Sequence, residues 1–412
     1  MKIVYGTILN PLSPLDLWYC EDGALVFDEK TGKILFVGEA KEAREDFPQA
    51  EKVDTPDNIL ITPSFVDAHL HAVQYKIIGT FEGVELLPWL QKFTWPEESK
   101  FAKSDYAEKV FQEFLHDLLR NGTTTAAVYS SIHENAVHAL YDISQDKARL
   151  FIGNVLMDQN SPDYLLQKTD DAINVVERLA KKYKDRYVVT PRFAITCSMK
   201  LMKSVAAIAR KYNCFIQTHL SENKEEVEFV RKLFPDCKNY TDVYYQAGLL
   251  GPKSIMGHAI YLSNQELELL RNTNTKIAHC PISNYELLSG RMTVERFLLM
   301  GVNFTLGTDI AGGHEISMLG VMRRFLDEHR YFAPIRPSQA LYWGTLDGAE
   351  ALGLQNVAGN LAYGKYADFL VLHKPKGAVN PDEYMEGLMA GDYDNIVAKT
   401  FFEGREVYSK QN

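Results

Sequence analysis

The chain has 412 residues, and 46% of them are hydrophobic, so it can build one large domain with an appendage or two domains. Lysine and arginine number 44 against 54 acidic residues, and the net charge of −10 argues against nucleic acid as the main partner. Five cysteines without a Cys-x-x-Cys pair favour a reduced, cytoplasmic protein. The opening residues are interrupted too early for a signal peptide, and no apolar stretch reaches membrane length, so we expect a soluble chain.

The first 60 residues predict short strands joined by turns, including a hairpin between residues 23–27 and 33–37. An apolar run at residues 59–66 predicts a buried strand, which leads into a segment with two histidines. Side chains two apart on a strand share a face, so His69 and His71 can point at one spot. Two neutral imidazoles there suit a divalent metal. An isolated His-x-His motif, however, is more often just two half-exposed histidines at a strand end.

After this pair, strands alternate with helices along the chain. Seven further strands are expected, at residues 123–129, 150–156, 187–194, 214–219, 254–258, 276–279 and 302–306. Helices are expected at residues 104–120, with Ser104 as the N-cap, and at 170–184, 200–211, 223–233, 264–271 and 293–300. Eight parallel strands over about 250 residues fit a closed (β/α)8 TIM barrel. An open doubly wound sheet is the alternative, but no Gly-x-Gly-x-x-Gly follows the first strand.

The end of the chain returns to β-structure, at residues 367–372, 396–402 and 406–408. We expect these strands to pack with the first residues as one small β domain built from both chain termini. The predicted α/β organisation is a barrel at residues 63–355, with residues 1–62 and 356–412 as the two parts of the small domain.

Polar residues stand where each predicted barrel strand ends. They are His69 and His71 after the first strand, Arg192 late in the fourth, His219, His258 and His279 ending the next three, and Asp309 after the eighth. Barrel enzymes build their sites at the C-terminal ends of the strands, so these groups would ring one mouth. A single histidine at a strand end is more often structural, but this many on one face indicate a metal site.

Several motifs resemble the amidohydrolase superfamily, and the resemblance covers residues 60–345, fading toward both ends. The motifs are Pro63-x-Phe65-Val66-Asp67-x-His69-x-His71, Thr218-His219-Leu220-Ser221-Glu222, His258, His279-Cys280-Pro281 and Gly307-Thr308-Asp309. Within the superfamily, Gln74 and the segment Thr190-Pro191-Arg192-Phe193 resemble the branch that deaminates guanine.

The resemblance implies that His69, His71, His219 and Asp309 bind one zinc ion, with iron as the alternative because the same donors accept both. Such a metal lowers the pKa of water toward about 7 and so supplies hydroxide. Asp309 would also accept the proton of the attacking water.

The remaining catalytic roles also follow from the resemblance. Glu222 would carry protons to the purine and then to the departing amine, and His258 would polarise the water or the tetrahedral intermediate. Glu222 has a second interpretation, as an acid favoured by the dipole of the helix that follows it.

The same resemblance implies that Gln74, Arg192 and the backbone beside Phe193 read the carbonyl and ring nitrogens of guanine, with Arg192 presenting a fixed donor fork. It also implies that Glu222 would contact the base. His279 would bind substrate, polarise the water, or only support the ligands. Trp89, Trp95 and Phe193 could supply a stacking surface for the base, although such aromatic residues more often belong to the core.

The expected function is hydrolytic deamination of guanine to xanthine and ammonia by a homodimer whose partner is a small purine, with neither nucleic acid nor membrane involved. Sister activities on adenosine-like nucleosides or triazines share the metal core and stay open, although Gln74 and Arg192 favour guanine. A non-catalytic scaffold would lack a ligand or the acid, and none is missing here.

Overall fold

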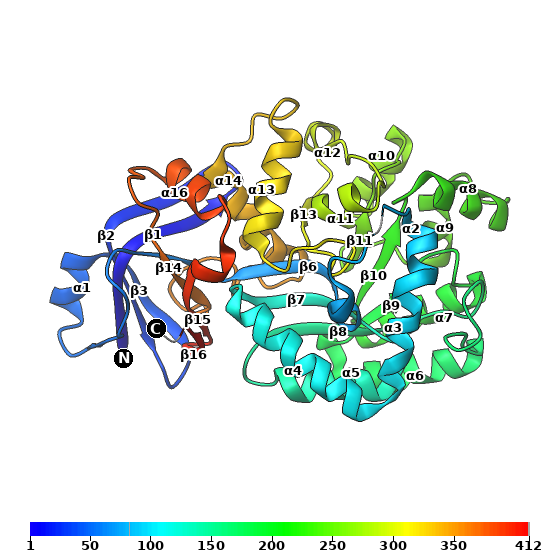
Figure 1. Ribbon diagram of the computed structural model, residues 1–412, viewed down its shortest axis with the longest axis horizontal. Coiled ribbons are helices and arrows are strands. Elements are labelled where there is room, and N and C mark those ends of the chain that lie inside the picture. The colour runs from blue at the N-terminus through cyan, green and yellow to red at the C-terminus, as the bar shows by residue number, and fades with distance from the viewer. Residues whose placement is uncertain (82, 411–412) are drawn as a thin grey trace.

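The computed structural model describes residues 1–81 and 83–410, and its larger lobe is a barrel of eight parallel strands (Figure 1). Neighbouring strands follow one another in sequence order from the first to the last. They are β6 (Phe65–His71), β7 (Thr123–Ser130), β8 (Arg149–Leu156), β9 (Val188–Pro191), β10 (Phe215–Leu220), β11 (Ser254–His258), β12 (Lys276–His279) and β13 (Phe304–Leu306). The predicted barrel is confirmed.

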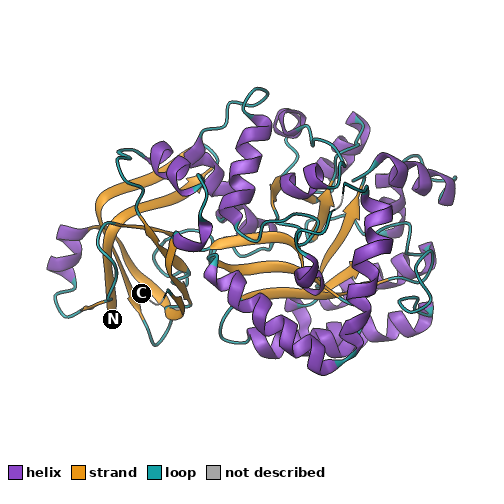
Figure 2. Cartoon of the chain, in the orientation of Figure 1, coloured by secondary structure: helices purple, strands orange, loops and turns teal. Residues whose placement is uncertain are grey.

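Helices surround the barrel strands on the outside (Figure 2). The six helices expected from the sequence are present, each within one residue of its expected ends: α4 (Ser104–Arg120), α6 (Thr169–Tyr183), α7 (Met199–Tyr212), α8 (Lys224–Leu233), α10 (Asn264–Asn272) and α12 (Val294–Met300). The sequence did not predict α5 (Glu134–Ser144), α9 (Tyr240–Ala247), α11 (Pro281–Glu286), α13 (Met318–His329), α14 (Pro337–Trp343) and α15 (Leu346–Ala351).

Helix α4 shows why the longer helices were readable from the sequence. Its buried residues include Val110, Phe114 and Leu118, which recur every four positions and face the core. The helix ends before Gly122, whose φ of +83° suits glycine. The predicted N-cap is wrong: Lys103 occupies that position, and the Ser104 hydroxyl instead accepts a hydrogen bond from Asn135.

The second lobe is a mixed sheet built from both ends of the chain, as predicted. Its order is β16-β15-β14-β5-β1-β2-β3, with β4 beside β1. The strands are β1 (Lys2–Ser13), β2 (Asp16–Asp28), β3 (Lys33–Glu39), β4 (Glu51–Lys52), β5 (Ile59–Pro63), β14 (Phe369–His373), β15 (Val397–Phe402) and β16 (Arg405–Ser409). Strands β1 and β2 have 12 and 13 residues, longer than the short strands expected. Helices α1 (Ala40–Asp46) and α16 (Pro381–Leu388) complete this lobe.

The apolar run at residues 59–66 is two strands, so the prediction of one strand is wrong. Strand β5 lies in the terminal sheet between β14 and β1, and β6 begins the barrel two residues later. At the crossing, the Ser64 amide donates to the Asp368 carbonyl at 3.0 Å. Because both strands are buried on both faces, the apolar pattern does not mark the change of sheet.

The barrel closes where β6 meets the segment that follows β13. The Asp309 amide donates to the His69 carbonyl at 2.8 Å, and the His71 amide donates to the Ile310 carbonyl at 3.1 Å. These hydrogen bonds place Asp309 directly beside the two histidines of β6.

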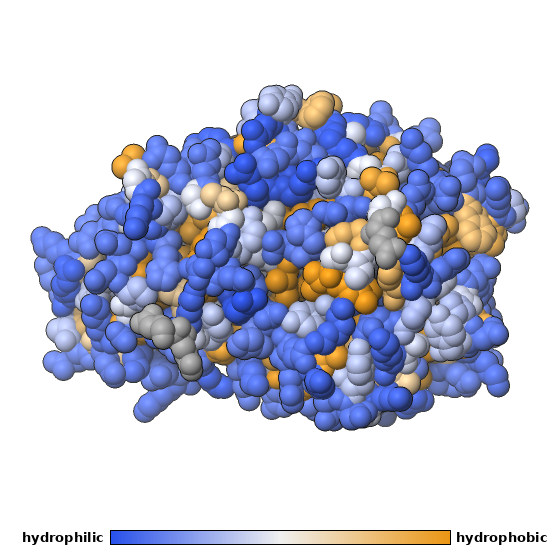
Figure 3. Space-filling view, in the orientation of Figure 1, coloured by the Kyte–Doolittle hydropathy of each residue, from blue (hydrophilic) through white to orange (hydrophobic). Residues whose placement is uncertain are grey.

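The outer face is mostly hydrophilic, with apolar atoms gathered near the centre of the view (Figure 3). Among the described residues, no helix has both the length and the apolar character needed to cross a bilayer. The exact domain boundaries at residues 62/63 and 355/356 stay a prediction.

A buried ion pair joins the two lobes at the end of the barrel where β8 begins. The Arg149 guanidinium donates to Asp368 at 2.7 Å and to Glu403 at 2.8 Å, and the Asp368 side chain is only 2% exposed. Desolvated charges of this kind depend on their partner, because water cannot replace it.

We therefore expect Arg149→Met to lower the free energy of unfolding by about 3–5 kcal/mol, since it leaves a buried carboxylate unpaired. Arg178→Met is the control, because Arg178 is 58% exposed in its pair with Glu134 and should lose no more than about 1 kcal/mol. Urea unfolding measures both variants. Equal losses would contradict the role given to the buried pair.

Candidate active site

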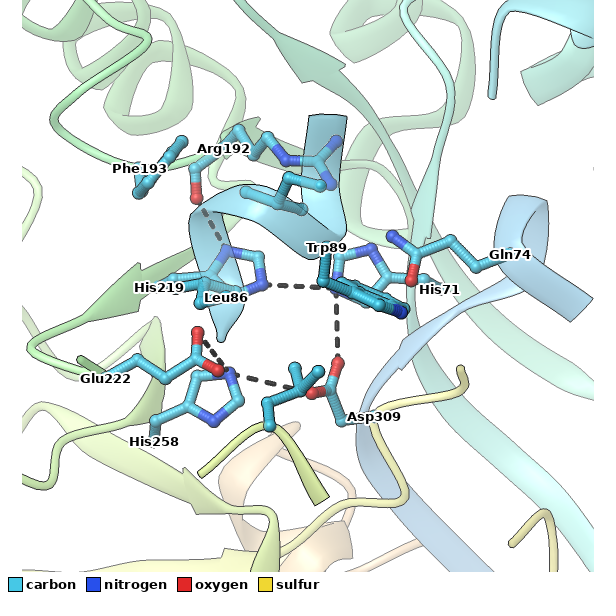
Figure 4. A pocket seen from close by; sticks show the side chains of 12 residues that line it. His71, Gln74, Leu86, Trp89, Arg192, Phe193, His219, Glu222, His258 and Asp309 are labelled. Atoms are coloured by element: carbon cyan, nitrogen blue, oxygen red, sulfur yellow. Dashed lines mark hydrogen bonds and ion pairs between the residues drawn. The ribbon is translucent and has the colours of Figure 1, made fainter. Parts of the chain in front are cut away.

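The structure brings the predicted site residues to the C-terminal end of the barrel. His69 and His71 lie within β6 itself, and His219 and His258 lie in β10 and β11. Arg192 directly follows β9, and Glu222 and Asp309 follow β10 and β13. Eight of the predicted residues line one pocket: His71, Gln74, Arg192, Phe193, His219, Glu222, His258 and Asp309 (Figure 4). His69 lies beside His71, His219 and Asp309.

Four of these side chains form a compact donor cluster: His69, His71, His219 and Asp309. One ligand atom from each lies within 4.8 Å of every other. Nε2 of His71 is 3.1 Å from Nε2 of His219 and 3.4 Å from Oδ1 of Asp309. Oδ1 of Asp309 is also 3.3 Å from Nε2 of His69.

The protonation of the cluster fits a divalent cation. His219 Nδ1 lies 2.7 Å from the Arg192 carbonyl, which can only accept, so the neutral ring turns an unprotonated Nε2 toward the cluster. Burial holds the pKa of His71 and of His219 well below the ordinary value, so both are neutral. Burial also raises the pKa of Asp309, but the adjacent side chains of His69 and His258 outweigh this effect and keep the carboxyl ionised. Three imidazoles and one carboxylate are a sound donor set for zinc.

Glu222 and His258 form a second pair against the cluster. Nε2 of His258 lies 3.4 Å from Oε2 of Glu222 and 3.8 Å from Oδ2 of Asp309. Burial raises the pKa of Glu222 to about 7, and Asp309 adds to the rise. Burial lowers the pKa of His258, but Glu222 and Asp309 outweigh it, and the net pKa is raised. Glu222 and His258 can therefore each gain or lose a proton near neutral pH, and both face the pocket beside Asp309.

The helix-capping interpretation of Glu222 does not match the local geometry. Asn223 caps α8 by accepting from the Glu225 amide at 2.8 Å, and Glu226 accepts from the Asn223 and Glu222 amides to complete the capping box. The Glu222 carboxylate turns away from the helix and accepts from the Ser289 hydroxyl at 3.2 Å. Glu222 is free for chemistry because its neighbours do the capping.

Apolar side chains wall the rest of the pocket, whose empty space is about 360 Å³ including the part open to solvent. Leu86 and Trp89 come from α2 (Leu86–Trp89), and Leu90 from the π-helical turn η2 (Leu90–Thr94) that continues it. Leu287 completes the wall. Of the two tryptophans considered for stacking, Trp89 lines the pocket and Trp95 belongs to the core.

Sequence reasoning missed Glu98, which lies on α3 (Trp95–Ser99). Its carboxylate accepts from Gln74 Nε2 at 2.9 Å and from Arg192 Nη1 at 2.7 Å. Gln74 itself lies on the 3₁₀ turn η1 (Ala72–Ile77) directly after β6. No sequence signal marks Glu98, because its two partners are 24 and 94 residues away along the chain.

Two further supporting residues were also missed. Asp67 accepts from the amides of His69 and Thr308, each at 3.1 Å, and so holds β6 to the segment that carries Asp309. Asn284 Oδ1 lies 2.8 Å from Nδ1 of His258 and fixes that ring. Asp67 lies two residues before the His-x-His pair and could have been suspected from that position, whereas Asn284 carried no comparable signal.

His279 does not join the pocket. Its Nε2 lies 3.1 Å from Nε2 of His329 on α13, and it packs against Phe325. Arg291 lies 3.2 Å from Nδ1 of His329. We therefore leave His279, expected as a substrate-binding residue, out of the proposed machinery.

Residues 60–407 match the amidohydrolase family, and the chain belongs to that family. A guanine deaminase of Escherichia coli (strain K12) is 33% identical over 100% of this chain and 98% of its own length. The guanine deaminase of Homo sapiens is 37% identical over 90% of this chain and 86% of its own length. A crystal structure of guanine deaminase from C. acetobutylicum with bound guanine in the active site has a TM-score of 0.92 and 31% identity, covering 99% of this chain and 100% of that one.

We expect the purified protein to carry one divalent metal per chain and His219→Ala to lose it, because three donors hold a metal far less tightly than four. His138→Ala is the control, because His138 on α5 belongs neither to the donor cluster nor to the second group of possible ligands, His279, Glu328 and His329. Elemental analysis of both variants measures the metal content. Full occupancy in His219→Ala would rule out the proposed ligand set.

Proposed function

We propose that this protein is a guanine deaminase, which hydrolyses guanine to xanthine and ammonia with a metal held by His69, His71, His219 and Asp309. The observation that carries the proposal is that one pocket joins three parts: the donor cluster, the Glu222–His258 pair, and a polar end formed by Gln74 and Arg192. The similarity to guanine deaminases over the whole chain supports the same substrate.

Zinc is the metal we propose, because a set of three imidazoles and one carboxylate is typical of catalytic zinc sites that keep a position for water. When bound, it lowers the pKa of water and supplies hydroxide near neutral pH. The buried Nε2 of His69 supports this assignment: among the described residues it has no hydrogen-bond partner, and it lies 3.3 Å from Oδ1 of Asp309.

Glu222 is the proton carrier in the proposed reaction. It takes a proton from the attacking water and delivers it to a ring nitrogen of guanine, while the water oxygen bonds to the carbon that bears the amino group. The second proton of the same water, carried by Glu222 or by Asp309, then reaches the amine, the carbon–nitrogen bond breaks, and ammonia leaves. Asp309 serves as the alternative acceptor for the water's second proton.

His258 stabilises the tetrahedral carbon by its position between the two carboxylates. Asn284 occupies Nδ1 of the ring, so Nε2 faces Glu222 and Asp309. A raised pKa favours the protonated ring, which can donate to the developing oxyanion.

The purine is held at the other end of the pocket. Arg192 donates to Glu98 through Nη1. Its other N–H groups are available to donate to the carbonyl and ring nitrogens of guanine. Phe193 and the apolar wall from Leu86, Trp89 and Leu90 cover the ring faces. Adenosine-like nucleosides and triazines lack the ring carbonyl of guanine that Arg192 would bind, so we propose them only as alternative substrates.

The homodimer and the cytoplasmic location expected from the sequence stay predictions. Sedimentation velocity tests the first, and cell fractionation tests the second.

Ammonia release across guanine, adenine, cytosine, adenosine and a triazine is the experiment that tests the proposed substrate. We expect guanine to give the highest kcat/KM by at least about tenfold, since a site built to bind a carbonyl rejects bases that lack it. Faster turnover of adenosine or of the triazine would favour the sister activities.

Glu222→Gln separates proton transfer from helix capping. We expect it to keep fold, metal and guanine binding while kcat falls by about 10²–10⁴-fold, because glutamine cannot carry a proton. Glu225→Gln is the matched control: it removes an exposed acid from the first turn of the same helix and should leave kcat near wild type. If kcat stays within a few fold of wild type in Glu222→Gln, the carrier role is wrong.

A further inference from the structure

We propose that Glu98 is a positioning residue that fixes Gln74 and Arg192 in the arrangement that selects the purine; this inference rests on the proposed function. Glu98 lies outside the residues that line the pocket and acts through the two that do. Nothing in the sequence motifs assigns it a role.

Glu98 connects Gln74 and Arg192 through its two carboxylate oxygens, and we call these three residues the clamp. One carboxylate oxygen, Oε1, accepts from Gln74 at 2.9 Å, and the other, Oε2, accepts from Arg192 at 2.7 Å. The Glu98 side chain is 0% exposed and the Arg192 side chain 3%. The three residues come from three separate elements, so the clamp holds η1, α3 and the segment after β9 together.

The acceptor chemistry decides how Gln74 is oriented. A carboxylate can only accept, so the nitrogen of the Gln74 amide must face Glu98, and the oxygen must face the other way. The Ala311 amide donates to that oxygen at 3.4 Å, which agrees with this orientation. Without Glu98 the amide could turn over and exchange its donor and acceptor toward the substrate.

The charge of Glu98 also sets what Arg192 can bind. Arg192 is a buried cation, and in the described structure Glu98 is the acidic residue paired with it. Neutralised in this way, the guanidinium suits a neutral carbonyl and ring nitrogens rather than an anion. Removing the carboxylate leaves a buried charge without its partner, which costs affinity for a neutral base.

The same helical segment supplies the apolar wall. Trp89 and Leu90 line the pocket, and Glu98 follows on the continuation of that helix through η2 and α3. The clamp therefore ties the wall over the base to the residues that read its edge. Glu97, one residue earlier, points elsewhere: it accepts from Lys100 at 2.6 Å and from the Tyr106 hydroxyl.

The test measures kcat, KM and the guanine dissociation constant for Glu98→Gln, with melting temperature and metal content on the same samples. We expect KM and the dissociation constant to rise roughly 10- to 100-fold, as when a buried hydrogen-bonding partner is lost, and kcat to stay within about fivefold. Glu97→Gln is the matched control, a buried glutamate on the same helix, and should leave KM unchanged.

Two further variants keep the proposal falsifiable. Glu98→Asp keeps the charge but is too short for both contacts, so a positioning role predicts a raised KM in a folded protein. In an Arg192→Gln background, Glu98→Gln should raise KM by a smaller factor than it does in the wild type, because one of its two partners is gone.

A KM within threefold of wild type in both Glu98→Gln and Glu98→Asp would overturn the positioning role, and so would an equal rise in Glu97→Gln. If the wild-type protein binds guanine but releases no ammonia, the proposed function is wrong. The dissociation constants of the Glu98 variants then still test the positioning role. If the wild type does not bind guanine, both ideas fall.

Discussion

The seam between β6 and the segment after β13 is the constraint on which the site depends. Two backbone hydrogen bonds close the barrel there, from the Asp309 amide to the His69 carbonyl and from the His71 amide to the Ile310 carbonyl. Asp67 reinforces the seam by accepting from amides on both sides. Closing the barrel therefore also brings together three of the four donors, His69, His71 and Asp309, while His219 comes from β10. Damage to this seam would disperse the ligands as well as open the barrel.

Around this seam, each reactive side chain is held by a second residue. Asn284 turns His258, the Arg192 carbonyl fixes the tautomer of His219, and Glu98 holds the Arg192 side chain. Arg192 thus serves both halves of the pocket: its backbone carbonyl contacts His219, a proposed metal ligand, and its side chain lies at the end proposed to bind the purine. Because these partners are buried, each contact is protected from water and its geometry is kept.

Much of this arrangement could be predicted from the sequence, and the exceptions have physical causes. The alternation of strands and helices predicted the barrel. The two-residue spacing of His69 and His71 predicted that the site lies at the C-terminal ends of its strands. The run at residues 59–66 misled, because two buried strands in different sheets share one apolar pattern. Glu98 was invisible because its contacts join residues far apart in the chain. His279 fitted the strand-end pattern, yet it pairs with His329 instead of facing the pocket. Position along a strand is encoded locally, whereas partners across the fold are not.

Removal and return of the metal tests the central claim most directly, namely that the buried cluster holds a cation needed for guanine hydrolysis. The chelator-treated protein should keep its circular dichroism spectrum and lose ammonia release from guanine, and one equivalent of zinc per chain should restore it. Full ammonia release from protein shown by elemental analysis to be free of metal would contradict the account.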